Sequence, residues 1–219
     1  MKLKLLLLVT AFAFCSKLYA QQNIPFANEV KDFKHRDSLN FPKPGGFLFI
    51  GSSSIRLWAD LEQRFSAAPI IKRGVGGSEL SQWVAYYAPD LIYPYKPAKI
   101  YVYAGDNDIA AGKSAKNVAA DFAKLWGMIR QQLPDAEIYW LSMKQSPVRA
   151  KYYSEVILGN QLVKTFISSK SKTYYVDFNT PIIDKKTSLP DSSLFKGDYL
   201  HLNNKGYDKW QVALAPYIN

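Results

Sequence analysis

The chain has 219 residues, with 28 Lys and Arg against 18 Asp and Glu, 48% hydrophobic residues, one Cys and two His. This length suits one folded domain, and the balance of hydrophobic and charged residues excludes an intrinsically disordered chain. A single Cys excludes a disulfide framework, and one Cys with two His offers too few ligands for the usual zinc site. The sequence contains no long basic run, which argues against a nucleic-acid partner.

The first twenty residues have the pattern of a secretory signal peptide. Two lysines precede an apolar stretch over residues 5–14, and Ala20 stands directly before two glutamines. The stretch is about half of the roughly 20 apolar residues that a membrane-spanning helix needs, so we expect cleavage after Ala20 and no stable membrane insertion. A lipid anchor on Cys15 is the alternative, but bulky Phe14 precedes it where a small residue is needed. The pattern predicts a secreted or periplasmic protein.

Cleavage of residues 1–20 changes the composition of the mature chain. It removes three lysines and no acidic residue, so the formal net charge falls from +10 to +7, and it removes the only Cys. Thiol chemistry is therefore excluded for the mature protein. Residues 21–44 are expected to form an N-terminal arm packed on a domain over residues 45–219, because Phe26, Val30 and Phe33 lie at helical spacing.

Short apolar runs alternate with longer stretches of helical periodicity from residue 47 onward. Strands that alternate with helices predict a parallel sheet with crossover helices. We therefore expect an α/β fold, a three-layer α/β/α sandwich around a five-stranded parallel sheet of the flavodoxin-like type. The expected strands are residues 47–51, 69–75, 99–105, 137–143 and 173–178.

The clearest helix is expected over residues 114–133, where Ser114 can cap the start and Pro134 follows the end. Similar periodicity predicts a helix in the next crossover and one at the end of the domain. Residues 179–197, which contain Pro181 and Pro190, match neither pattern, and the sequence does not show whether they form a lid. The apolar residues that recur on one face are Val118, Phe122, Leu125 and Ile129, then Leu158, Leu162 and Phe166, and finally Tyr207, Trp210, Leu214 and Tyr217.

Polar and glycine-rich loops follow several of the expected strands. In open parallel sheets, ligands bind at the carboxyl ends of the strands. Chemistry is therefore expected in four segments: GSSSI (51–55), GVGGSEL (74–80), AGDNDIA (104–110) and GDYLHLNNKGY (197–207).

These segments contain the parts of a serine hydrolase. Ser53 stands at a strand-to-helix turn, and a serine hydroxyl becomes a nucleophile when a base and an orienting carboxylate accompany it. Asp198 and His201, three residues apart, supply both, whereas the other histidine, His35, lies in a charged segment. Taken alone, Ser53 also fits a helix cap and His201 a surface histidine.

Donors for a developing negative charge are available in the two remaining loops. Gly76 and Gly77 allow close approach of the backbone, and Asn107 offers a side-chain amide. Each of these also fits an ordinary turn. Their placement at one edge of one expected sheet favours a catalytic site.

The order and content of the four loops resemble the SGNH (GDSL-type) hydrolase family. Residues 105–108 match its GxND block and residues 198–201 its DxxH block, and the second block places Gly77 at the family's oxyanion glycine, with Gly76 the alternative. The first block departs from the family, because Ser52 replaces the Asp of Gly-Asp-Ser. Ser53 takes the nucleophile position, and Ser52 and Ser54 are the alternatives.

The resemblance implies a serine esterase that needs no cofactor or metal. Ser53, His201 and Asp198 would form the triad, and Gly77 and Asn107 would bind the oxyanion. The segment FIGSSSIRLW is similar to the branch of the platelet-activating-factor acetylhydrolase catalytic subunit, which implies a short acyl group. The many aromatic residues suit O-acetyl groups on a carbohydrate, although core and helix packing is the favoured explanation for any one of them. A lysophospholipase or thioesterase, a flavodoxin-like module and a non-catalytic glycan-binding module remain alternatives.

Overall fold

The computed structural model describes residues 24–218, so the predicted signal peptide lies outside the described residues. Within that part, five parallel strands form one central sheet in the order β2-β1-β3-β4-β5. The strands are β1 (Phe47–Gly51), β2 (Ile70–Gly74), β3 (Lys99–Tyr103), β4 (Glu137–Leu141) and β5 (Thr173–Val176). The predicted five-stranded parallel sheet is confirmed. Four strands end before the predicted apolar run does, because the chain turns into the loops there.

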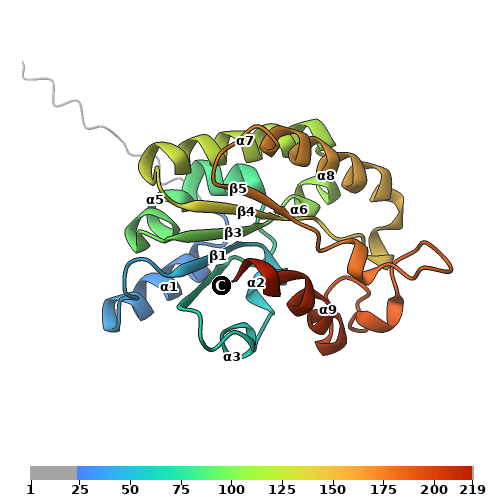
Figure 1. The fold of residues 1–219 in the computed structure, drawn as a ribbon, viewed down its shortest axis with the longest axis horizontal. Helices are drawn as coiled ribbons and strands as arrows, with labels where there is room; N and C mark the ends of the chain where they lie inside the picture. Colours follow the sequence, from blue (N-terminus) through green and yellow to red (C-terminus); the bar gives the residue numbers. More distant parts are fainter. Residues whose placement is uncertain (1–23, 219) are drawn as a thin grey trace, which may run out of the picture.

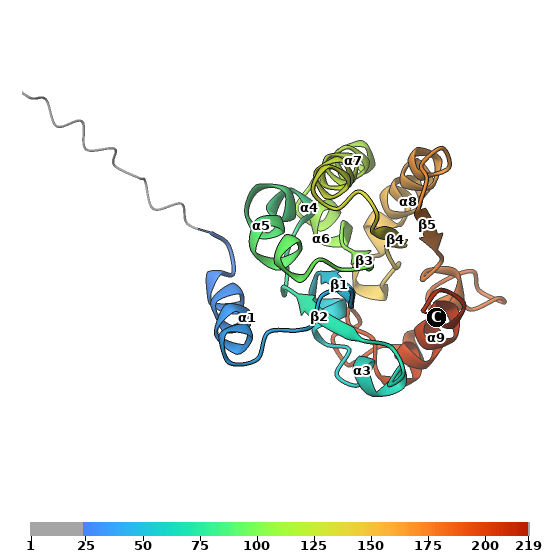
Figure 2. The ribbon, with the colours of Figure 1, turned by 60° about the vertical axis from the view of Figure 1, so that its left-hand side comes forward.

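Helices cover both faces of the sheet, which confirms the three-layer α/β/α architecture (Figures 1 and 2). One face carries α2 (Ser53–Arg56), α3 (Leu61–Arg64) and α9 (Asn204–Leu214). The other face carries α4 (Leu80–Gln82), α5 (Ala88–Leu91), α6 (Asp106–Ala110), α7 (Ala115–Gln132) and α8 (Tyr153–Ile167).

The central strand β1 shows how the two cores form. Leu48 and Ile50 are buried in the core beneath α7 and α8, whereas Phe49 is buried in the core beneath α9. Successive strand residues point to opposite faces, so a strand that is covered on both faces is apolar at every position. This explains why the strands read as continuous apolar runs.

The long helix α7 confirms the prediction made from its periodicity. The Ser114 hydroxyl accepts a hydrogen bond from the backbone N–H of Asn117 at 3.2 Å, which caps the first turn. Val118, Phe122, Leu125 and Ile129 are fully buried against the sheet. In the last helix, α9, Tyr207, Trp210 and Leu214 are buried as predicted.

The buried face predicted for α8 is wrong. Leu158 is 40% exposed, and the buried positions include Gly159, Asn160 and Val163. The Asn160 side chain bonds both the N–H and the carbonyl oxygen of Met143, at 2.9 and 2.8 Å. A polar residue that satisfies a buried backbone thus occupies the core face, and the apolar periodicity does not mark it.

Helix α1 (Ala27–Leu39) lies beside β2 at the edge of the sheet (Figure 2). Val30 and Phe33 are buried as expected from their spacing, whereas Phe26 is 43% exposed. The Asp37 carboxylate pairs with Arg73 of β2, which ties the helix to the edge strand. The helix is therefore held alongside the edge strand through this pair.

Residues 179–197 form an anchored loop. Two 3-10 turns, Thr180–Ile182 and Ser192–Leu194, flank an antiparallel bridge between Ile183 and Pro190. Ile182 and Leu194 are buried in the core beneath α9, which fixes both ends of the loop. Over residues 24–218, no helix has both the length and the apolar character that a membrane crossing requires.

Candidate active site

The turn after β1 presents Ser53 as the first residue of α2. Gly51 has a φ of 124°, and a Cβ atom there would lie 1.8 Å from the carbonyl oxygen of Tyr103, so the position requires glycine. The same carbonyl accepts the N–H of Ser52 at 2.9 Å, which ties the turn to β3. The half-buried Ser53 is thereby held at the carboxyl edge of the sheet.

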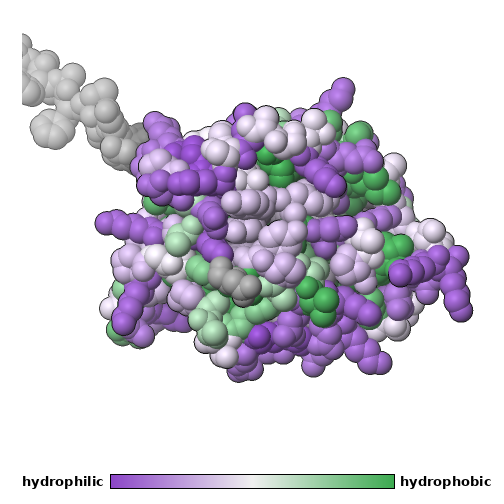
Figure 3. Space-filling view, in the orientation of Figure 1, coloured by the Kyte–Doolittle hydropathy of each residue, from purple (hydrophilic) through white to green (hydrophobic). Residues whose placement is uncertain are grey.

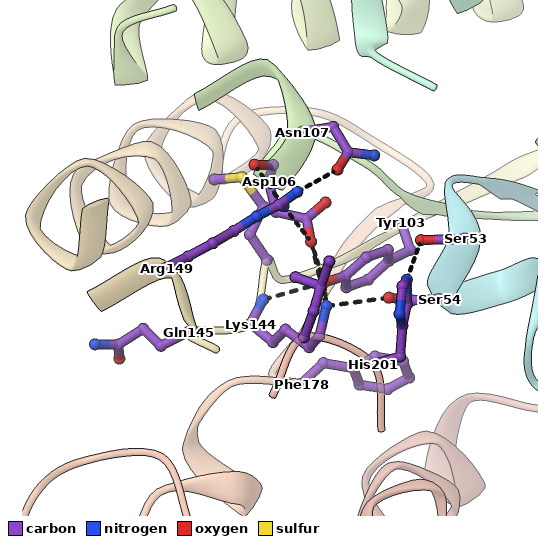
Figure 4. Close-up of polar contacts among 12 residues, drawn as sticks. Ser53, Ser54, Tyr103, Asp106, Asn107, Lys144, Gln145, Arg149, Phe178 and His201 are labelled. Carbon is purple, nitrogen blue, oxygen red and sulfur yellow. Dashed lines mark hydrogen bonds and ion pairs between the residues drawn. The ribbon is translucent and has the colours of Figure 1, made fainter. Parts of the chain in front are cut away.

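The three consecutive serines have different surroundings. The Ser53 Oγ lies 3.0 Å from Nε2 of His201 (Figure 4). The Ser54 Oγ instead faces the Lys144 ammonium at 3.1 Å, and the Ser52 Oγ is buried with no hydrogen-bond partner among the described residues. Of the three hydroxyls, that of Ser53 meets the histidine.

A tight turn before α9 brings Asp198 and His201 together. One carboxylate oxygen of Asp198 accepts the backbone N–H groups of Leu200 and His201, both at 2.9 Å, and the other lies 2.7 Å from His201 Nδ1. Tyr199 takes a left-handed φ of 52° in this turn, and its carbonyl accepts the N–H of Val148 at 3.2 Å. The Asp198–His201–Ser53 chain of contacts has the geometry of a hydrolase triad.

The hydrogen bonds of this turn control the charge of Asp198. Desolvation alone would raise the pKa of its carboxyl, but the backbone N–H and side chain of His201, with the N–H of Leu200, lower that pKa well below its usual value. The carboxylate is therefore ionised throughout the neutral range and can stabilise a positively charged His201.

The loop after β2 offers one free backbone donor among its two glycines. Gly76 is buried, and its N–H donates to the Glu29 carboxylate at 2.8 Å. Gly77 is exposed with a φ of 76°, and within residues 24–218 neither its N–H nor that of Ser53 has a hydrogen-bond partner. A carboxylate at this loop also disfavours its use as a phosphate cradle.

Asn107 is held in a defined orientation at the start of α6. Its side-chain oxygen accepts a hydrogen bond from Arg149 Nη2 at 2.9 Å (Figure 4). Its Nδ2 donates to the Ser78 carbonyl at 3.1 Å. An amide nitrogen carries two hydrogens, so one remains for a substrate oxygen. Arg149 and the Ser78 carbonyl thus together determine which end of the Asn107 amide is the donor.

A buried charged network lies beneath these residues (Figure 4). Lys144, 2% exposed, places its Nζ 3.2 Å from both the Asp106 carboxylate and the Tyr103 hydroxyl. Burial raises the pKa of Asp106, but Lys144 and Arg149 reverse this and lower it, whereas burial lowers the pKa of Lys144 against the effect of Asp106. The network links the turns after β1, β3 and β4.

Sequence reasoning missed Lys144, Arg149 and Glu29. A lone lysine directly after the apolar run 137–143 is the one local signal for Lys144. Arg149 and Glu29 lie in ordinary polar segments. Their positions in the sequence do not indicate that Arg149 bonds Asn107 or that Glu29 bonds Gly76. These contacts become visible only in three dimensions.

Of the aromatic residues that suit carbohydrate binding by type (Trp58, Trp83, Tyr86, Tyr87, Trp140, Tyr152 and Tyr153), four are core residues and three are half-buried. Trp58, Trp83, Tyr87 and Trp140 are fully buried and cannot stack on a sugar. On the face drawn in Figure 3, hydrophobic residues lie in separate groups among hydrophilic ones. Among residues 24–218, no group of three or more His, Cys, Asp or Glu side chains is placed to hold a metal ion.

The chain was compared with known families and structures. The GDSL-like lipase/acylhydrolase family model matches residues 50–209. No curated protein sequence matches the chain. A similar solved structure is a Streptococcus pneumonia protein provisionally described as a platelet activating factor, with 20% identity, a TM-score of 0.77, and coverage of 88% of this chain and 92% of that chain.

Two further structures share the fold. A GDSL-like lipase from Bacteroides thetaiotaomicron has 17% identity and a TM-score of 0.72, covering 88% of this chain and 98% of that chain. A variant of an acetyl-xylooligosaccharide esterase from Geobacillus stearmophilus has 15% identity and a TM-score of 0.66, covering 81% and 96%. At such identities the likeness shows the fold alone.

Proposed function

The chain belongs to the GDSL-like lipase/acylhydrolase family, and from this membership we propose that it is a secreted serine esterase that hydrolyses carboxylic esters with a short acyl group. The observation that carries the proposal is the contact of Ser53 Oγ with His201 Nε2 at 3.0 Å, with Asp198 on the other ring nitrogen. The signal-peptide pattern of residues 1–20 supports export.

The reaction is acyl transfer to water. Ser53 Oγ attacks the ester carbonyl carbon while His201 Nε2 takes its proton, and Asp198 orients the ring and stabilises the imidazolium. His201 then gives the proton to the departing alcohol oxygen. A water molecule, deprotonated by His201, attacks the acyl-enzyme carbonyl, and His201 returns that proton to Ser53 Oγ as the acid leaves.

The tetrahedral intermediate places a negative charge on the former carbonyl oxygen. Three donors serve it: the backbone N–H groups of Ser53 and Gly77 and one Nδ2 hydrogen of Asn107. Gly77 is preferred to Gly76 because the Gly76 N–H already donates to Glu29. Arg149 acts as a positioning residue, since with the Ser78 carbonyl it fixes the orientation of the Asn107 amide.

Substitution of Asn107 by alanine is expected to lower kcat by about 10²-fold, because one oxyanion donor is lost. Arg149→Met is expected to lower kcat by roughly tenfold, because the amide loses one of the two contacts that fix its orientation while the donor remains. Adding Arg149→Met to Asn107→Ala should have no further effect on kcat. Steady-state kinetics of the four proteins form a double-mutant cycle. If the two substitutions lower kcat independently, so that their fold-losses multiply in the double variant, the positioning role of Arg149 is contradicted.

The proposed substrate is an O-acetyl group on a carbohydrate. An esterase of acetylated xylooligosaccharides and a carbohydrate esterase of family 3 share this fold, which supports the choice of an acetyl ester. The buried tryptophans give no support, so the alcohol half of the substrate rests on these likenesses. The formal charge of +7 after cleavage suits a polyanionic glycan or surface.

A panel of p-nitrophenyl esters with two to twelve acyl carbons, run beside acetylated xylan and pectin, tests the acyl preference. We expect kcat/KM to be highest for acetate and to fall with chain length, with acetate released from at least one polysaccharide. If kcat/KM is instead highest for acyl chains of eight carbons or more, a lysophospholipase or thioesterase activity would replace the proposal. Absence of Ser53-dependent hydrolysis of every ester would overturn it.

A further inference from the structure

We propose that the first turn of the N-terminal arm completes the active site, with Glu29 positioning the oxyanion glycine and Phe26 bordering the space for the acyl group. The inference rests on the esterase function proposed above. Both residues lie outside the span 50–209 that the family model matches. The arm would thus contribute to the site from outside the span that the family model matches.

The contacts of Glu29 define the conformation of the glycine loop. Its Oε2 accepts the Gly76 N–H at 2.8 Å and lies 3.8 Å from Nε of Arg56. The Arg56 guanidinium lies against the Cα of Gly76, since a Cβ atom there would lie 2.6 Å from Nε. Gly76 is therefore enclosed by a carboxylate and a guanidinium. This enclosure fixes the backbone that carries the neighbouring N–H of Gly77.

Helix α1 is anchored near both of its ends, so its first turn has a fixed place. The Tyr87 hydroxyl donates to the carbonyl of Pro25 at 2.7 Å, just before the helix begins. Near its end, the buried Asp37 carboxylate accepts hydrogen bonds from Arg73 and from the Tyr95 hydroxyl. A rigid support of this kind is what a positioning residue requires.

Phe26 lies directly against the exposed oxyanion glycine. A Cβ atom on Gly77 would lie 3.0 Å from the tip of the Phe26 ring, and the ring itself is 43% exposed. An exposed aromatic ring beside an exposed glycine is available to a bound substrate, whereas a core residue is not.

The acyl half of the ester is the part expected to reach Phe26. His201 protonates the departing alcohol, so the alcohol must point toward His201 and the acyl chain away from it. The glycine loop follows β2, on the side of β1 where α1 lies, whereas α9, which follows His201, lies away from α1 (Figure 2). A short acyl group fits this arrangement, because the Phe26 ring limits the space beside the oxyanion.

Glu29 is tested by a set of three substitutions on α1. Glu29→Ala is expected to lower kcat on the order of tenfold, with a smaller change in KM, because Gly76 loses its acceptor. Glu29→Gln keeps an acceptor oxygen and should retain most of kcat. Asp32→Ala, which removes an exposed acidic residue of the same helix, should leave kcat unchanged. Equal kcat for the Glu29→Ala and Asp32→Ala enzymes would overturn the positioning role.

Phe26 is tested against a second exposed aromatic residue of the arm. Phe41 is 48% exposed and stacks on Tyr95 at 5.4 Å. In a panel of p-nitrophenyl esters, Phe26→Ala should raise kcat/KM for the octanoate relative to the acetate by about fivefold or more, since the space opens. Phe41→Ala should keep the parental ratio. An unchanged ratio in Phe26→Ala would remove Phe26 from the acyl site.

These outcomes are distinguishable from a failure of the proposed function. If the parent enzyme hydrolyses the esters in a Ser53-dependent way while both arm tests fail, the present inference alone is wrong. If the parent enzyme shows no such hydrolysis, the proposed esterase function is wrong, and the proposed role of the arm is wrong as well. Thermal unfolding of each variant shows whether it is folded. If Glu29→Ala does not fold, the ester panel with Phe26→Ala still tests the role of the arm.

Discussion

Replacement of Ser53 by alanine is expected to lower kcat toward a short-chain ester by at least about 10⁴-fold and to abolish labelling by a fluorophosphonate probe. The hydroxyl is the atom proposed to form the acyl-enzyme, and loss of one triad member removes most of the covalent route in serine hydrolases. His201→Ala should have a similar effect on kcat. The measurements are steady-state hydrolysis and detection of the labelled protein.

Ser52 provides the matched control for this experiment. Its hydroxyl is buried without a partner in the described part of the chain, so Ser52→Ala changes a neighbouring serine by the same single atom. We expect the Ser52→Ala enzyme to keep its activity and its labelling. Labelling that persists in Ser53→Ala, or that disappears in Ser52→Ala, would move the nucleophile to another hydroxyl.

Substitution of Lys144 by methionine is expected to lower the free energy of unfolding by about 3–5 kcal/mol. The substitution leaves the Asp106 carboxylate, 5% exposed, without its ammonium partner at 3.2 Å, and an uncompensated buried charge is strongly destabilising. Arg149, with Nη1 at 3.6 Å from the same carboxylate, replaces only part of this interaction. Urea unfolding followed by tryptophan fluorescence measures the loss.

A pair of the same chemistry whose lysine is exposed serves as the comparison. Lys124 lies 3.7 Å from Asp121 and its side chain is 67% exposed, so Lys124→Met should cost less than about 1 kcal/mol. Adding Asp106→Asn to Lys144→Met should recover part of the loss, because the buried negative charge is removed. Equal losses from the two lysine substitutions would show that burial does not determine the strength of the Lys144 interaction.

The fold was predictable because its signals are local. The strands are continuous apolar runs, α7 has its cap and its four-residue spacing, and the loops at the carboxyl ends contain Ser53, Asn107 and His201 in recognisable segments. Parallel topology then places these loops at one edge. Contacts within one short segment, such as that of Asp198 with His201, follow from spacing alone.

The supporting contacts were not predictable, because each joins distant residues of ordinary type. Lys144 and Asp106 are 38 residues apart, Arg149 and Asn107 42, and Gly76 and Glu29 47. The buried face of α8 was predicted wrongly for the same reason, a contact with a residue outside the helix. Asn160 is buried because it satisfies the backbone of Met143, and a hydrophobic pattern carries no information about such a partner.

The contact between Ser53 and His201 spans 148 positions of the chain. Ribosomes make a protein from its amino terminus, and a segment that emerges early waits for its distant partners. A partly made chain therefore contains Ser53, the glycine loop and Asn107 long before it contains His201, the base that would activate Ser53. Ester hydrolysis would begin only after the turn before α9 has packed beside Ser53. The onset of activity would therefore mark the completion of folding.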